Sequence, residues 1–81
     1  MVSAKKQILW VDDEIEFLLA HILFLEEHNY DVEKTTNGDD AIELIQERDF
    51  DLIFLDEQMP GKDGLSTLKE LKDLKPVIPV V

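Results

Sequence analysis

Three aspartates in this 81-residue chain follow short apolar runs, and their positions suggest a shared chemistry. Asp12 and Asp13 come directly after the run ILWV, and Asp56 comes directly after IFL. A carboxylate at the tip of a buried strand is costly unless a partner compensates its charge. Three neighbouring carboxylates either share a proton or bind a divalent cation, and an all-oxygen set suits Mg²⁺ or Mn²⁺. An aspartate beside such a cation can act as a nucleophile towards phosphorus.

The apolar pattern predicts alternating strands and helices that would bring these acids together. The predicted elements, in chain order, are a strand at 8–11, a helix at 14–28, a weak strand at 31–35, a helix at 39–48, a strand at 52–55, a helix at 65–74 and the start of a strand at 77–81. This order predicts an α/β fold, a doubly wound parallel sheet with helices on both faces. Ligands of such sheets bind beyond the carboxyl ends of the strands, so the three aspartates are expected at one edge.

The first predicted helix carries two local patterns. Asp13 and Glu16 have the spacing of an N-cap and its capping-box partner. The apolar stripe expected to face the sheet comprises Ile15, Leu18, Leu19, Ile22 and Leu25. Beside it, at spacings of four, three and four, lie Phe17, His21, Phe24 and His28. We interpret the two histidines as ordinary helix-surface residues.

Composition excludes several functional classes. Nineteen acidic residues against eight basic ones give a formal net charge of −11, which repels nucleic acid and anionic membranes. Neither is therefore an expected partner of this segment. The absence of cysteine excludes disulfides and thiolate chemistry. The N-terminal apolar run is too short for a signal peptide or a membrane span, so a cytoplasmic location is the default expectation.

Two motifs together carry a resemblance to a known family. "ILWVDDE", followed some forty residues later by "FLDEQMPGKDG", resembles the receiver domain of two-component response regulators. The resemblance implies a flavodoxin-like fold with strand order 2-1-3-4-5, an example that general fold rules already include. "LWVDDEI" with "HILFLE" is also similar to receivers of the PorX-like group, which carry an alkaline-phosphatase-superfamily output domain.

The resemblance implies a role for each site residue. Asp56 would be the phosphoacceptor, taking a phosphoryl group from a sensor histidine kinase or a phosphotransfer protein. Asp13 would bind Mg²⁺ directly and Asp12 largely through water, while Asp56 and the backbone carbonyl of Gln58 would supply further ligands. Phosphorylation would then control an output domain in the parent chain. Such a protein supports its own phosphorylation but is not an enzyme in the usual sense.

The family pattern also implies residues that this sequence does not contain. A complete receiver has five strand–helix units, and its Ser/Thr and Lys that contact the phosphoryl group would follow Val81. Residues 1–81 are thus expected to form a partial receiver domain, ending within the fourth strand, that holds the acceptor and metal ligands but not the switch. The 77–81 edge would be a template for pairing, which predicts a homodimer or an element-exchanged dimer of this fragment.

Other readings of the acids stay open. Asp13 could be a helix cap alone, and Asp56 could merely end a strand. A pseudo-receiver, a phosphorylation-independent interaction module, is the main alternative function. A Mg²⁺-dependent phosphatase with an aspartyl nucleophile is disfavoured, because Gln58 stands where such enzymes need a second acid.

Overall fold

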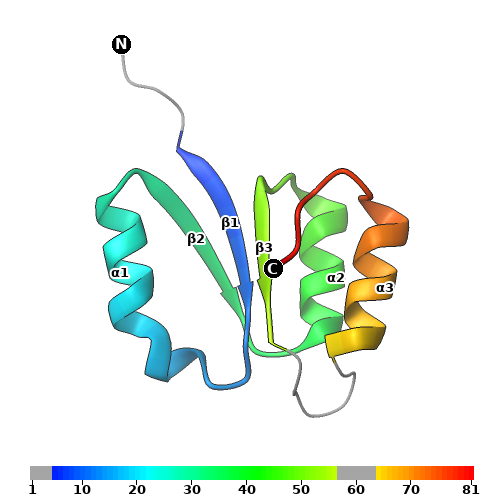
Figure 1. Ribbon diagram of the computed structural model, residues 1–81, viewed down its shortest axis with the longest axis horizontal. Helices are drawn as coiled ribbons and strands as arrows, with labels where there is room; N and C mark the ends of the chain where they lie inside the picture. Colours follow the sequence, from blue (N-terminus) through cyan, green and yellow to red (C-terminus); the bar gives the residue numbers. More distant parts are fainter. Residues whose placement is uncertain (1–4, 57–63) are drawn as a thin grey trace.

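A parallel three-stranded sheet forms the centre of the molecule. The computed structural model describes residues 5–56 and 64–81. Strands β2 (Tyr30–Thr35), β1 (Lys6–Val11) and β3 (Leu52–Leu55) lie in the order β2-β1-β3, and both pairings are parallel (Figure 1). This order is the beginning of the 2-1-3-4-5 arrangement. The predicted doubly wound, flavodoxin-like α/β fold is therefore confirmed.

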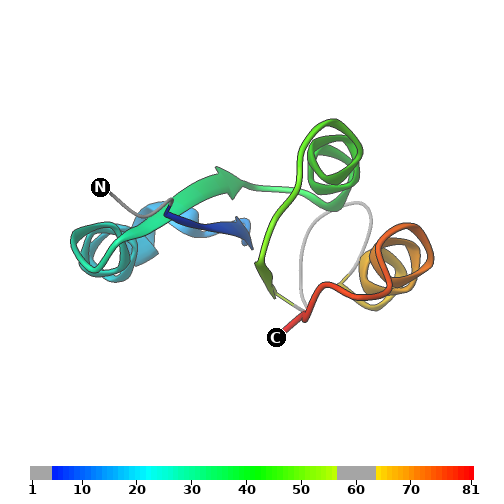
Figure 2. The same cartoon turned by 90° about the horizontal axis from the view of Figure 1, so that it is seen from above.

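Helices cover both faces of the sheet. The 3₁₀-helix η1 (Ile15–Leu18) and helix α1 (Leu19–Glu27) lie on one side, and α2 (Gly38–Glu47) and α3 (Gly64–Leu74) lie on the other (Figure 2). The side chains of β1 alternate between the two faces, which separates two apolar cores. The core under α2 and α3 contains Leu9, Val11, Ala41, Ile45, Phe50, Ile53, Leu71 and Ile78. The core under α1 contains Ile8, Ile22 and Val32, with Trp10, Ile15, Leu18, Leu25, Tyr30, Leu52 and Phe54 packed against it.

The first helix begins differently from the prediction. Its first turn is the 3₁₀-helix η1, whose N-cap is Glu14 with no side-chain capping bond, so the predicted Asp13–Glu16 capping box is wrong. The backbone N–H of Glu14 instead donates to Oδ1 of Asp12 at 2.9 Å. Asp12 is the residue that leaves the strand, so its side chain reaches this amide through a local turn of the kind aspartate favours. The predicted stripe is also wrong at Leu19, which is exposed.

The predicted fourth strand is reduced to a single bridge. Val80 pairs in parallel with Ile53 on the free side of β3, and no longer strand is formed within 64–81. The preceding residues form a turn, in which the amide of Ile78 donates to the carbonyl of Lys75 at 3.2 Å. Pro76 favours this turn because its φ angle is fixed, and Pro79 has no N–H to donate to a ladder.

Helix α2 begins at Gly38, one residue before the start of the helix predicted at 39–48. Asn37 is its N-cap, and the Asn37 side chain accepts a 2.8 Å hydrogen bond from the amide of Asp40. Since this bond satisfies an otherwise unpaired helix N–H, it sets the first turn of α2 firmly after β2.

The amino ends of the strands are joined by polar contacts. The amide of Asp51 donates to the carbonyl of Gln7 at 2.7 Å, and the amide of Gln7 donates to Oδ2 of Asp51, also at 2.7 Å. The guanidinium of Arg48 donates to Glu33 at 3.2 Å and to Gln7 at 3.0 Å. Its carbon Cζ lies 4.9 Å from the centre of the Phe50 ring. These contacts link β1, β2 and the end of α2 at the edge opposite the aspartates.

Candidate cation site

Backbone pairing delivers two of the three aspartates to one edge of the sheet. The amide of Asp12 donates to the carbonyl of Thr35 at 3.0 Å, which extends the β1–β2 ladder by one residue. The amide of Asp56 donates to the carbonyl of Val11 at 2.9 Å, which extends the β3–β1 ladder in the same way. Both carboxylates are therefore carried by paired backbone and not by a free loop.

The three carboxylates meet at this edge. Asp12, Asp13 and Asp56, hereafter the aspartate cluster, each offer an oxygen, and these oxygens lie within 4.8 Å of one another. Asp12 and Asp56 are half-buried and Asp13 is exposed. They line a shallow hollow together with Glu14, Phe17 and Leu18. The sequence thus correctly predicted that the ends of two separate strands would meet.

The donor set of the aspartate cluster fits a hard divalent cation. Only carboxylate oxygens converge there among the described residues, with no imidazole or thiolate in the group. Mg²⁺ prefers one or two carboxylates with several waters, and Asp13 on the open side leaves room for such waters. Oδ1 of Asp12 accepts the Glu14 amide, which fixes the orientation of this carboxylate and leaves its Oδ2 free of that bond.

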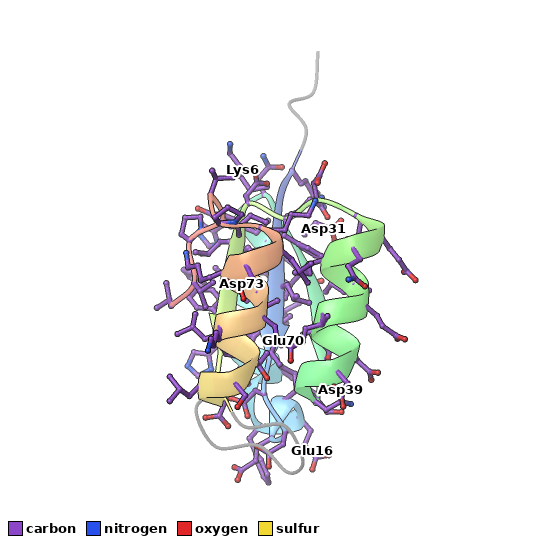
Figure 3. All side chains as sticks on the ribbon, turned by 90° about the vertical axis from the view of Figure 1, so that its right-hand side faces the viewer. Lys6, Glu16, Asp31, Asp39, Glu70 and Asp73 are labelled. Carbon is purple, nitrogen blue, oxygen red and sulfur yellow. The ribbon has the colours of Figure 1, made fainter. Side chains whose placement is uncertain are left out.

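More acids surround this end of the molecule. Glu16 and Asp39 lie at the end where the strands finish, whereas Lys6 and Asp31 lie at the opposite end (Figure 3). Negative side chains around a cluster raise the local concentration of cations even without direct coordination. Any test of a defined site must therefore separate it from diffuse attraction.

Several predicted residues fall outside the aspartate cluster or outside the described chain. Gln58, the predicted carbonyl ligand, lies outside the described residues, as does the Met59–Gly61 segment.

Nδ1 of His28 lies 2.7 Å from the carbonyl oxygen of Phe24, and the rings of His28 and Phe24 stack with their centres 4.1 Å apart. This contact is local to α1, in agreement with a helix-surface role. Trp10 packs against Phe54, with ring centres 4.8 Å apart.

Sequence reasoning missed one buried polar residue next to the aspartate cluster. Thr35 is 6% exposed and supplies the carbonyl that holds the Asp12 amide. The position of Thr35, two residues before the turn-forming pair Asn37-Gly38, could have indicated this role. The hydroxyl groups of Ser and Thr often form a hydrogen bond with the backbone two residues ahead.

The family follows from comparison with known proteins. The model of the response regulator receiver domain matches residues 8–81. The chain belongs to this family. The finer likeness to the PorX-like group stays a prediction.

Named relatives of this receiver domain agree with the assignment. The transcriptional regulatory protein ZraR of Salmonella typhimurium is 37% identical over 81 residues, which is 100% of this chain and 18% of the relative. The chain thus spans less than a fifth of that protein. The response regulator TrrA of Thermotoga maritima, in complex with Mg(2+)-BeF, is 32% identical with a TM-score of 0.84, over 93% of this chain and 65% of TrrA.

A second solved structure is informative about chemistry in the family. A response regulator from Burkholderia pseudomallei, with a phosphorylated aspartic acid, calcium ion and citrate, is 30% identical with a TM-score of 0.84. The match covers 94% of this chain and 45% of that protein.

In the described part of this receiver domain, no helix is long and apolar enough to cross a membrane.

Proposed function

We propose that this receiver domain is the phosphoacceptor of a two-component phosphorelay and that Asp56 receives the phosphoryl group. The observation that carries the proposal is the meeting of Asp56 with Asp12 and Asp13 within 4.8 Å at the carboxyl edge of the sheet. The phosphorylated aspartic acid of the Burkholderia relative supports the same chemistry here. The donor would be a phosphohistidine of a sensor kinase or phosphotransfer protein.

Each aspartate has a separate task in this proposal. A carboxylate oxygen of Asp56 forms the new bond to phosphorus, while the bond from phosphorus to the donor nitrogen breaks and its electron pair leaves with the imidazole. Asp12, Asp13, Asp56 and the Gln58 carbonyl would hold Mg²⁺, and the Mg(2+)-BeF complex of TrrA supports that choice. When bound, the cation offsets the negative charge of the carboxylates and the phosphoryl group. The paired backbone of Asp12 and Asp56 keeps both side chains oriented before the donor arrives.

The phosphorylated receiver would act through an output domain of the full-length protein. It would not act as an enzyme on a separate substrate. The relatives named transcriptional regulatory proteins support such an output. The net charge of −11 supports the expectation that the receiver domain itself does not bind DNA directly. A sensor kinase as the phosphodonor would favour a cytoplasmic location.

Phosphorylation by a small phosphodonor tests the proposed function. The full-length protein and its Asp56→Asn and Asp51→Asn variants are each incubated with acetyl phosphate and Mg²⁺. The intact mass of each is then measured. We expect one added phosphoryl group on the unchanged protein and on Asp51→Asn, and none on Asp56→Asn. A phosphoryl group that survives Asp56→Asn would refute Asp56 as acceptor. No transfer at all would favour the phosphorylation-independent interaction module.

Self-association of the 81-residue chain is a further part of the proposal. Val81 lies beyond the bridge at Val80 and is exposed, as is Val77. The backbone of this short apolar segment, which lies along the free side of β3, could pair with the same segment of a second copy. Sedimentation velocity of the folded chain tests this, and a single monomeric species at all concentrations would contradict it.

A further inference from the structure

Thr35 connects the start of α2 to the aspartate cluster. Its hydroxyl donates to the carbonyl of Asn37 at 3.0 Å and accepts from the amide of Asn37 at 3.3 Å. Asn37 in turn caps α2 through the amide of Asp40, and its Nδ2 donates to Oδ2 of Asp40 at 2.9 Å. On its other side, the carbonyl of Thr35 accepts the Asp12 amide at 3.0 Å. An unbroken series of bonds therefore leads from the first turn of α2 to Asp12.

The geometry of this turn explains how a hydroxyl can act on a distant carboxylate. The ring closed by the Thr35 hydroxyl and the Asn37 amide encloses the peptide group between Thr35 and Thr36. That same peptide group carries the carbonyl that accepts the Asp12 amide. While the ring is closed, the carbonyl cannot rotate away from Asp12 without breaking the hydroxyl bond. Burial of Thr35 keeps water from replacing that bond cheaply.

We propose that Thr35 is a positioning residue for Asp12, and that its hydroxyl holds the Asp12 backbone in the orientation the aspartate cluster needs to bind a divalent cation. Only the statement about cation binding rests on the proposed function. The positioning of Asp12 stands on the hydrogen bonds alone. Thr35 touches no ligand, and it acts through the peptide group it orients.

Four variants separate this role from a general loss of stability. Thr35→Val keeps the shape and strand preference of threonine and removes the hydroxyl, while Thr35→Ser keeps the hydroxyl. Thr35→Ala supplies a second, smaller variant without the hydroxyl, in case the valine variant folds poorly. Thr36→Val removes the hydroxyl of the exposed neighbour and is the matched control.

Amide hydrogen exchange at Asp12, relative to Leu9 in the middle of β1, gives the decisive readout. Global destabilisation speeds exchange at both amides, whereas loss of positioning speeds it at Asp12 alone. We expect the Asp12-to-Leu9 exchange ratio to rise about fivefold in Thr35→Val and Thr35→Ala, as the loss of one hydrogen bond implies. Thr35→Ser and Thr36→Val should keep the original ratio. An unchanged ratio in the folded hydroxyl-free variants would overturn the inference.

Mg²⁺ binding, measured by isothermal titration, then tests the functional clause. We expect Thr35→Val to weaken the Mg²⁺ affinity about threefold, since residues that orient a metal ligand modulate affinity without contacting the metal. An equal loss in Thr36→Val, or an unchanged affinity in Thr35→Val, would overturn the functional clause. If the exchange ratio rises as expected but the original chain binds no Mg²⁺, Thr35 still positions Asp12 and the cation-dependent part of the proposed function fails.

Discussion

The amide of Asp56 donates a 2.9 Å hydrogen bond to the carbonyl of Val11, the residue immediately before Asp12. Strand β3 is thus paired with β1 up to the point where each strand is followed by an aspartate. The closeness of Asp56 and Asp12 is a property of the sheet and does not depend on any attraction between their side chains. Like charges are held together by the fold, and a bound divalent cation would offset the repulsion between them.

The cost of the aspartate cluster can be measured directly. Without divalent cations, Asp13→Asn should raise the free energy of unfolding by about 0.5–1 kcal/mol, because it removes one charge from a group held within a few ångströms. Asp31→Asn removes the same charge from an exposed site at the opposite end of the molecule and should change stability less. Urea unfolding of both variants is the measurement, and equal effects would indicate that only the net charge matters.

Helix α3 offers a matched test of core packing. Leu71 is 1% exposed and belongs to the core under α2 and α3, whereas Leu65 is 76% exposed. Leu71→Ala should lower the free energy of unfolding by about 3 kcal/mol, from lost burial and the cavity left behind. Leu65→Ala should stay within about 0.5 kcal/mol of the original. Circular dichroism in urea compares them, and similar losses would contradict the described orientation of α3.

Arg48 should contribute more stability than an ordinary surface cation. It contacts Glu33, Gln7 and the Phe50 ring together, although its side chain is 40% exposed. Arg48→Met should cost about 1 kcal/mol, since several partners are lost at once. The ion pair of Lys75 is longer, at 3.5 Å, and its partner Asp49 is 95% exposed. Lys75→Met should therefore change thermal unfolding little, and a larger effect than that of Arg48→Met would contradict this ranking.

The sequence predicted the layers of the fold and the meeting of the aspartates because both depend on strong patterns. Short continuous apolar runs such as those at β1 and β3 are typical of buried strands, and parallel strands end at one edge. Caps and individual faces depend on weaker local forces. The Asp13–Glu16 spacing is that of a capping box, yet Asp12 was better placed to accept the Glu14 amide. The local turn at Asp12 therefore replaced the predicted cap.

Helix faces and edge strands were the other sources of error. Leu19 fits the predicted apolar stripe, but the rotation of the helix leaves it exposed. In α3, Leu65 is exposed and Thr67 is buried. Threonine is compatible with either environment, so its burial could not be predicted from residue type. The two prolines near Val77–Val81 were the sign that a full strand would not form there.

The most direct test of the account is where a divalent cation sits on this acidic chain. Mn²⁺ broadens the NMR signals of nearby nuclei, so a titration of the ¹⁵N-labelled chain with Mn²⁺ maps the bound ion residue by residue. We predict that the Asp12, Asp13 and Asp56 amides broaden first, that Mg²⁺ reverses the broadening, and that Asp12→Asn weakens it while Asp31→Asn does not. Broadening spread evenly over the acidic surface, and unchanged by Asp12→Asn, would contradict a defined cation site at the aspartate cluster.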